Sequence, residues 1–92
     1  VSFIDFWAKW CGPCKSFAKI FENVAKDNSD INFLSVDIEK EEELTKTFNI
    51  KSVPHLIVIK SGVVIYSDSG ALSSSSLKEL VVQAKNADVD SK

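Results

Sequence analysis

The segment FWAKWCGPCK, residues 6–15, holds both cysteines of this 92-residue chain, Cys11 and Cys14, with only Gly12 and Pro13 between them. A disulfide across this spacing closes a very small loop, and it adds little stability because the chain-entropy stabilisation from a cross-link increases with loop length. Two cysteines are also too few to form a disulfide scaffold. The pair is therefore better explained by chemistry at the sulfur atoms than by structural cross-linking.

The hydrophobic pattern changes its period across this segment. Residues 1–8, VSFIDFWA, form a short apolar run with β-branched and aromatic side chains, which is typical of a strand buried on both faces. From Cys14 to Ala25, apolar side chains recur at three- and four-residue steps, which predicts a helix. Pro13 suits the first turn of that helix. The cysteine pair is thus expected where a buried strand ends and a helix begins.

Five further elements are predicted along the chain: strands 31–38, 55–60 and 63–69, and helices 39–48 and 72–84. The turn Ser61-Gly62 would join the last two strands into an antiparallel hairpin. The order β-α-β-α-β-β-α predicts an α/β domain over residues 1–86, with a mixed sheet covered by helices on both faces. A polar tail, 87–92, is expected to follow it.

The sequence also predicts which side chains of the two later helices face inward and where the last helix is capped. Leu44 and Phe48 are expected to face inward from the first of them. Its carboxylates crowd the N-terminal end, where the helix dipole favours negative charge: Glu39, Glu41, Glu42 and Glu43. The last helix has a candidate capping box at Ser76 and Glu79, with Ser73 as another candidate cap.

A cysteine at the start of a helix ionises more readily than one in water. The first backbone N–H groups of a helix are unpaired and stabilise negative charge, and thiols in Cys-X-X-Cys motifs have pKa values of about 3.5 to 7.5, against about 8.5 for a free thiol. We therefore expect Cys11 to be the exposed attacking thiol and Cys14, one turn inside, to be the resolving thiol. Lys9 and Lys15 flank the pair and are candidates to hold the thiolate.

Two further roles for the cysteines stay open at this point. One is a metal half-site, but zinc needs four ligands, the only histidine is His55, and there is no second cysteine pair. The second is that the cysteines are inert structural residues. We expect no metal and no cofactor.

Asp5 stands in the middle of the first apolar strand. Burying a carboxylate without a partner costs several kcal/mol, on the order of what its neutralisation avoids, so its pKa is expected to be raised. Such a group exchanges protons near neutral pH and suits a general acid or base beneath Cys14. The alternatives are an aspartate paired with a buried lysine, or one at a strand end facing water.

Pro54 stands at a strand entrance, where proline is often only an edge marker. Base rates favour a trans bond there, since the cis form occurs in about 5–6% of X-Pro bonds. By default His55 is a partly exposed structural residue, but it would tune the cysteines if Pro54 packs against them. Trp7 is expected in the core, and Trp10 half exposed beside the thiol.

Charge and hydropathy exclude several classes of function. The formal net charge is −2 and all 11 basic residues are lysines, so neither an excess of positive charge nor arginine is available for nucleic acid. No apolar run approaches the roughly 20 residues of a membrane span. The chain begins at Val1 without a visible signal-peptide pattern. A cytoplasmic location is expected, with an organellar or exported one left open.

The motif resembles the active-site segment of the thioredoxin family over residues 6–15, FWAKWCGPCK. Other segments fall where that family has equivalents: Asp5, Val53-Pro54, Ser61-Gly62 and Gly70-Ala71-Leu72. The resemblance extends to about Ala84. It implies the thioredoxin fold, here without the family's first strand and helix at the N-terminus. The chain also departs from the family pattern with Lys19 for a helix proline, His55 after Pro54, and Ser35 for a lysine near the aspartate.

The resemblance implies dithiol–disulfide exchange, with Cys11 as nucleophile, Cys14 as resolving thiol and Asp5 as the proton-transfer group. It implies that Pro54 is cis and that the backbone of Val53 pairs with a substrate strand. The implied docking surface consists of Trp10, Gly12, Pro13, Val53, Pro54, Gly70 and Ala71.

The expected function is therefore reduction of disulfides in client proteins by a monomer that a thioredoxin reductase recycles. One alternative is a disulfide oxidase or isomerase domain of an exported or organellar protein, with His55 shifting the redox balance. Another is a binding module with the same fold, whose function would survive replacement of both cysteines by serine.

Overall fold

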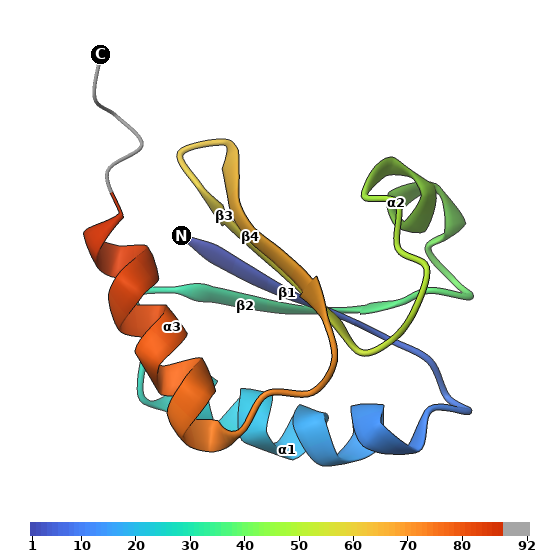
Figure 1. Ribbon diagram of the computed structural model, residues 1–92, viewed down its shortest axis with the longest axis horizontal. Coiled ribbons are helices and arrows are strands. Elements are labelled where there is room, and N and C mark those ends of the chain that lie inside the picture. Colours follow the sequence, from blue (N-terminus) through green and yellow to red (C-terminus); the bar gives the residue numbers. More distant parts are fainter. Residues whose placement is uncertain (88–92) are drawn as a thin grey trace.

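The computed structural model describes residues 1–87, so the end of the predicted tail, 88–92, lies outside the described residues. Seven elements follow one another: β1 (Ser2–Trp7), α1 (Gly12–Lys26), β2 (Asn32–Asp37), α2 (Glu42–Thr47), β3 (His55–Lys60), β4 (Val63–Ser69) and α3 (Ser74–Asn86). Their order is the predicted one (Figure 1). Within residues 1–87, no helix has the length and apolar character that crossing a bilayer requires.

The strands form one four-stranded sheet in the order β2-β1-β3-β4. β1 runs parallel to β2, and both β1/β3 and β3/β4 are antiparallel, so the sheet is mixed as predicted. The β3–β4 hairpin has the predicted bounds. Ser61 and Gly62 at its turn have φ of 52° and 77°, and positive φ at both central positions matches the twist of the flanking strands.

Two apolar clusters lie on opposite faces of the sheet. Helices α1 and α3 pack on one face, with α1 below the sheet and α3 at its left in Figure 1, and α2 lies on the other face. The larger cluster joins both long helices to β1, β2 and β3 and includes Phe3, Phe17, Phe21, Leu56, Val58 and Leu77. Because side chains alternate along a strand, Ile4, Phe6 and Ile57 point to the smaller cluster. Helices on both faces were the prediction, and it is confirmed.

The short helix α2 differs from its prediction. The backbone carbonyl of Asp37 accepts bonds from the N–H groups of Lys40 and Glu41, at 3.1 and 2.9 Å, so this stretch is a turn and the helix starts only at Glu42. Phe48 packs against Phe6 as expected. The inward direction predicted for Leu44 is wrong, since this side chain is 41% exposed. With six residues, the helix is too short to direct a second row of side chains at the sheet.

The two long helices begin near their predicted starts. α1 starts at Gly12 rather than Cys14, so that Cys11 is its N-cap and Pro13 lies in its first turn. α3 starts at Ser74, and Ser73 Oγ accepts a bond from the Ser76 N–H at 3.1 Å. The cap is therefore Ser73, and the box predicted at Ser76 and Glu79 is wrong because both residues already lie inside the helix.

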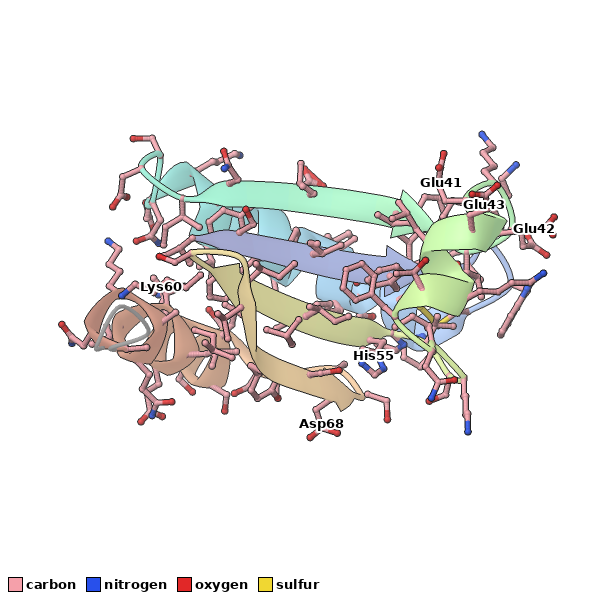
Figure 2. All side chains as sticks on the ribbon, turned by 90° about the horizontal axis from the view of Figure 1, so that it is seen from above. Glu41, Glu42, Glu43, His55, Lys60 and Asp68 are labelled. Atoms are coloured by element: carbon pink, nitrogen blue, oxygen red, sulfur yellow. A yellow bond between two sulfur atoms is a disulfide. The ribbon has the colours of Figure 1, made fainter. Side chains whose placement is uncertain are left out.

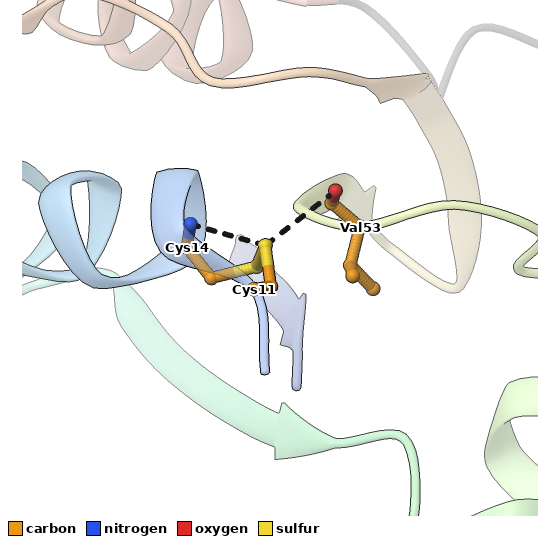
Figure 3. The surroundings of a disulfide bond; sticks show 3 residues. All are labelled: Cys11, Cys14 and Val53. Atoms are coloured by element: carbon orange, nitrogen blue, oxygen red, sulfur yellow. Dashed lines mark hydrogen bonds between the residues drawn. A yellow bond between two sulfur atoms is a disulfide. The ribbon is translucent and has the colours of Figure 1, made fainter. Parts of the chain in front are cut away.

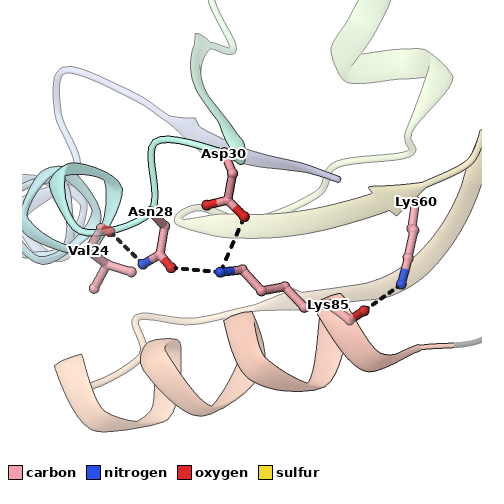
Figure 4. A network of polar contacts seen from close by, with 5 residues as sticks. All are labelled: Val24, Asn28, Asp30, Lys60 and Lys85. Atoms are coloured by element: carbon pink, nitrogen blue, oxygen red, sulfur yellow. Dashed lines mark hydrogen bonds and ion pairs between the residues drawn. The ribbon is translucent and has the colours of Figure 1, made fainter.

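Lysines tie the C-terminal end of α3 to the rest of the domain. Lys60 Nζ donates to the carbonyl of Lys85 at 2.8 Å (Figure 4) and to the carbonyl of Ala87 at 2.6 Å. Both are carbonyls near the helix end, where the helix leaves them unpaired. Lys85 Nζ reaches Asn28 Oδ1 and Asp30 Oδ2, both at 3.3 Å. These contacts join α3 to the hairpin and to the turn after α1.

Figure 2 looks onto the face of the sheet that carries α2. Glu42 and Glu43 lie in the first turn of α2 and Glu41 at its N-cap, as expected for carboxylates near the positive end of a helix dipole. Glu39 lies before the helix and donates its N–H to Asp37 Oδ1 at 2.9 Å. His55 lies at the start of β3, beside the same end of the sheet.

Candidate active site

Cys11 and Cys14 lie at the junction between β1 and α1, where the sequence predicts them. They form a disulfide, with their Cα atoms 5.3 Å apart (Figure 3). Cys11 Sγ accepts a hydrogen bond from the Cys14 N–H at 3.2 Å. That N–H is one of the groups that the first turn of a helix leaves unpaired. The helix start therefore directs a partial positive charge at the sulfur of Cys11.

The expected exposure of Cys11 is wrong for this disulfide form. Cys11 is 4% exposed and Cys14 2%. The disulfide holds Cys11 Sγ against the start of α1, and Val53 from the opposite loop packs against the cluster that the two cysteines form with Ala8. The backbone oxygen of Val53 lies 3.7 Å from Cys11 Sγ (Figure 3).

Asp5 is buried in β1, with 1% of its surface exposed. Among residues 1–87, neither of its carboxylate oxygens has a hydrogen-bond partner, so both alternatives, a buried lysine partner and a place facing water, are wrong. Burial raises the pKa of Asp5 from its ordinary 3.8 to about 6, as predicted. Asp5 and Cys14 line the same cavity.

The loop that ends in Pro54 closes the other side of the cysteines. The Val53–Pro54 peptide bond is cis, as the resemblance implies and against the base rate for proline. The carbonyl of Pro54 accepts a bond from the Gly70 N–H at 2.7 Å, which joins the loop to the end of β4. Gly70 and Ala71 are exposed beside it. The structure therefore brings together four residues of the implied docking surface: Val53, Pro54, Gly70 and Ala71.

The sequence matches the family model for Thioredoxin over residues 1–83. The chain belongs to the thioredoxin family. Among curated relatives, a putative thioredoxin 2 of Streptomyces coelicolor is 41% identical over 87 residues, which are 95% of this chain and 65% of that protein. A thioredoxin of Bacillus subtilis is 35% identical over 78 residues, 84% of this chain and 75% of the relative.

Solved thioredoxin structures have the same fold. The oxidised thioredoxin of Plasmodium falciparum superposes with a TM-score of 0.79 at 36% identity, covering 89% of this chain and 78% of that one. A germline-specific thioredoxin of Drosophila melanogaster superposes with a TM-score of 0.82 at 29% identity, covering 89% and 78%. The predicted thioredoxin fold is thus confirmed. The chain spans about two thirds of the Streptomyces relative.

The remaining predicted residues lie around the rim of this thioredoxin-family site. Trp10 is 68% exposed, more than the half expected, and Gly12 and Pro13 are exposed at the start of α1. Trp7 is only partly buried, although it packs against the cysteine cluster. Lys15 is exposed and lines the cavity that Cys14 and Asp5 share.

His55 bonds to a residue that sequence analysis did not single out. Its Nε2 lies 2.8 Å from Ser67 Oγ on β4. Burial lowers the pKa of His55, and the nearby charge of Asp68 opposes that change. Ser67 has no distinguishing signal in the sequence, because the pair depends on the register of the hairpin and on which face each side chain takes.

The described part of the chain offers no further ligands for a metal ion at the cysteines. No group of three or more histidine, cysteine, aspartate or glutamate side chains lies close enough together there to hold a metal ion. Both sulfur atoms are joined in the disulfide. The site geometry is that of a redox-active dithiol pair.

Proposed function

We propose that this protein is a dithiol–disulfide oxidoreductase that reduces disulfides in client proteins. The observation that carries the proposal is the N–H of Cys14 directed at Cys11 Sγ from the first turn of α1. A thiolate at Cys11 is stabilised by that donor and by the helix dipole. The family membership supports the same reaction class.

The reaction begins with the Cys11 thiolate attacking one sulfur of the client disulfide. A bond forms between Cys11 Sγ and that sulfur, the client S–S bond breaks, and the other client sulfur leaves as a thiolate that takes a proton from water. Cys14 then loses its proton and attacks Cys11 Sγ. The Cys11–Cys14 disulfide forms, the second client sulfur leaves, and two electrons have passed to the client.

Asp5 is the group we propose to accept the Cys14 proton. With a pKa of about 6, roughly nine in ten Asp5 side chains are ionised at pH 7. The carboxylate has no competing hydrogen-bond partner among the described residues. It is thus an available base on the inner side of Cys14, while the client occupies the outer side of Cys11.

We propose that the client binds as an extended strand beside the loop before Pro54. The backbone of Val53 supplies the hydrogen bonds, and Trp10, Gly70 and Ala71 flank it. Main-chain pairing of this kind is insensitive to side-chain identity, which fits a protein with many clients. Cys11 Sγ lies 3.7 Å from the Val53 oxygen, so a strand paired there brings its own disulfide to the nucleophile.

We further propose that a thioredoxin reductase returns the disulfide to the dithiol, that the protein acts as a monomer, and that it works in the cytoplasm. A dithiol used as a reductant needs a donor and a compartment that keeps thiols reduced. Sedimentation measures the oligomeric state independently of activity. Localisation of the full-length protein in its own cells measures the compartment.

Reduction of insulin tests the activity directly. The oxidised protein is reduced with NADPH and a bacterial thioredoxin reductase, and precipitation of the released insulin B chain is followed by turbidity. Wild type is expected to accelerate precipitation, and Cys11→Ser is expected to be inactive. A Cys11→Ser variant as active as wild type overturns the proposal. Acceleration with dithiothreitol but not with the reductase overturns the donor alone.

A further inference from the structure

β4 is an edge strand, and its outer side has no strand partner among residues 1–87. Figure 2 shows it at the edge of the sheet opposite β2, with Asp68 on it. An unpaired strand edge presents N–H and carbonyl groups to which another extended chain can bind. β4 leads directly into Gly70 and Ala71 of the docking surface, so this edge and the proposed client site are continuous.

The hydrogen-bond pattern of the hairpin shows which backbone groups of β4 face outward. The Gly70 N–H donates to the Pro54 carbonyl at 2.7 Å, and bonded and non-bonded pairs alternate along antiparallel strands. Counting back from this bonded pair, Ser69 and Ser67 belong to non-bonded pairs, so their N–H and carbonyl groups point away from β3. The Ser69 N–H already donates to Asp68 Oδ1 at 2.9 Å. Ser67 is therefore the residue that can bond a new strand through both its groups.

A groove lies next to β4, on the face of the sheet that carries α3. It has a volume of about 210 Å³, less than the roughly 300–1,000 Å³ typical of small-molecule sites, and suits a single side chain. Its apolar part consists of three half-buried side chains: Tyr66, Leu72 and Leu80. Its other lining residues are polar and exposed: Ser76, Glu79 and Gln83.

Two side chains of β4 lie on the same face as this groove. Tyr66 is opposite Val58, and Asp68 is opposite Leu56, and both of these partners belong to the larger cluster that α1 and α3 cover. Side chains alternate between the two faces of a strand. In a chain paired with Ser67, the residues on either side of the pairing residue would therefore face Tyr66 and Asp68.

These two positions favour different side chains. An apolar side chain next to Tyr66 fills the groove and removes apolar surface from water. A cation is favoured next to Asp68, which is exposed, and the charged side chain that lines the groove, Glu79, is also acidic. Antiparallel pairing, which is slightly more stable per residue than parallel pairing, puts the cation before the apolar residue in the added strand.

We propose that the edge of β4 binds an extended segment of the client protein with the pattern Lys-X-Leu. The backbone of X pairs with Ser67, the lysine faces Asp68, and the leucine enters the groove at Tyr66. In antiparallel pairing this segment follows the client cysteine, because β4 runs toward Gly70. Ser67 and Gly70 are roughly 10 Å apart along the strand, so one client chain reaches both. The choice of a client as the occupant rests on the proposed function.

The test titrates the peptide acetyl-Thr-Lys-Thr-Leu-Thr-amide into the oxidised protein and follows amide shifts by heteronuclear NMR. The peptide has no cysteine, so its binding is measured apart from disulfide exchange. Saturable shifts are expected at Ser67 and Tyr66. A peptide N-methylated at the central threonine keeps every side chain but loses the N–H that pairs with the Ser67 carbonyl. We expect it to bind about fivefold more weakly.

Substitutions in β4 test the same contacts. Ser67→Pro removes the outward N–H, at a position where an edge strand tolerates proline, and is expected to abolish the shifts. Ser67→Ala is the matched control, because it removes the hydroxyl and its bond to His55 but keeps the N–H, and it should bind like wild type. Asp68→Asn keeps an acceptor for the Ser69 N–H and removes the charge, so binding should weaken about two- to fivefold.

Three outcomes overturn this edge as a strand site: no saturable shifts, equal binding of the N-methylated peptide, or equal binding to the Ser67→Pro and Ser67→Ala proteins. If Ser67→Pro does not fold, the N-methylated peptide decides. Asp68→Asn binding as tightly as wild type overturns the lysine in the pattern.

The client assignment has its own measurement. In a peptide disulfide, Lys-Thr-Leu placed about four residues after the cysteine should give a KM about fivefold lower than the same residues in scrambled order, with kcat unchanged. Equal KM values overturn the client as the occupant. Reduction of neither substrate, together with saturable peptide binding, overturns the reductase proposal and leaves the strand site intact.

Discussion

Replacing Asp5 by asparagine changes how the stability of this protein depends on pH. Burial raises the pKa of Asp5 from 3.8 to about 6, and each tenfold change in a proton equilibrium corresponds to about 1.4 kcal/mol. Keeping this carboxylate ionised in the folded state therefore costs about 3 kcal/mol. An asparagine side chain has nearly the same shape but no proton to lose, so the variant lacks this cost.

The sign follows from the number of bound protons. Between pH 3.8 and about pH 6, Asp5 holds its proton in the folded state and has lost it in the unfolded state. The unfolded state binds fewer protons there, so wild-type stability falls as pH rises through this window. Below it, both states are protonated and Asp5 contributes no difference. The free energy of unfolding of Asp5→Asn minus that of wild type should therefore rise by about 3 kcal/mol between pH 3 and pH 7.5.

The assay is urea unfolding of the oxidised proteins, followed by circular dichroism at half-unit steps of pH. Comparing one variant with wild type across pH removes constant terms, such as the cost of burying the asparagine amide. Glu22→Gln on the exposed side of α1 is the control, and its difference from wild type should stay nearly flat. The reasoning is refuted if the free energy of unfolding of Asp5→Asn minus that of wild type does not change with pH, or if this difference falls as pH rises.

Three further perturbations test the site and the packing. Cys14→Ser should accumulate a mixed disulfide with a client, visible on non-reducing gels, whereas Cys11→Ser should form none; labelling of Cys14 before Cys11 by iodoacetamide at neutral pH would reverse these roles. Phe21→Ala should destabilise the domain by about 3–5 kcal/mol in urea unfolding, because its ring contacts other aromatic rings in the larger cluster; a loss under about 1 kcal/mol contradicts its place there. Lys60→Met should lose about 1 kcal/mol and keep insulin reduction unchanged, since its bonds end at the C-terminal carbonyls of α3.

Local patterns predict most of the fold because they are set within a few residues. The Ser61-Gly62 turn between two strand-like runs fixes the β3–β4 hairpin, and the three- and four-residue spacing from Cys14 fixes the buried side of α1. The sequence pattern overestimates the length of α2, the helix after β2. Four glutamates favour a helix start from Glu39 onward, but the turn closed by the Asp37 carbonyl delays it to Glu42, and this turn depends on how β2 ends.

The chemistry of the site is predicted better than its surroundings. An aspartate inside an apolar strand is visible in the sequence, and so is a cysteine pair at the junction of a strand and a helix. The burial of Cys11 is not, because it depends on the loop at Val53, which is 42 residues away. The cavity is also invisible in the sequence, since it requires the register that sets Ser35 across from Asp5.

The free-energy cost of burying Asp5 and the benefit to its proposed role as a base have the same magnitude. An ordinary thiol has a pKa of about 8.5, so passing its proton to a carboxyl of ordinary pKa, about 3.9, is uphill by roughly 6 kcal/mol. With the pKa of Asp5 raised to about 6, the same transfer is uphill by roughly 3 kcal/mol. The difference is the amount by which the ionised carboxylate weakens the fold. An apolar side chain at this position would remove that cost and, under the proposed mechanism, leave Cys14 without a base. The burial that destabilises β1 is therefore what would fit Asp5 for its proposed role of taking the proton.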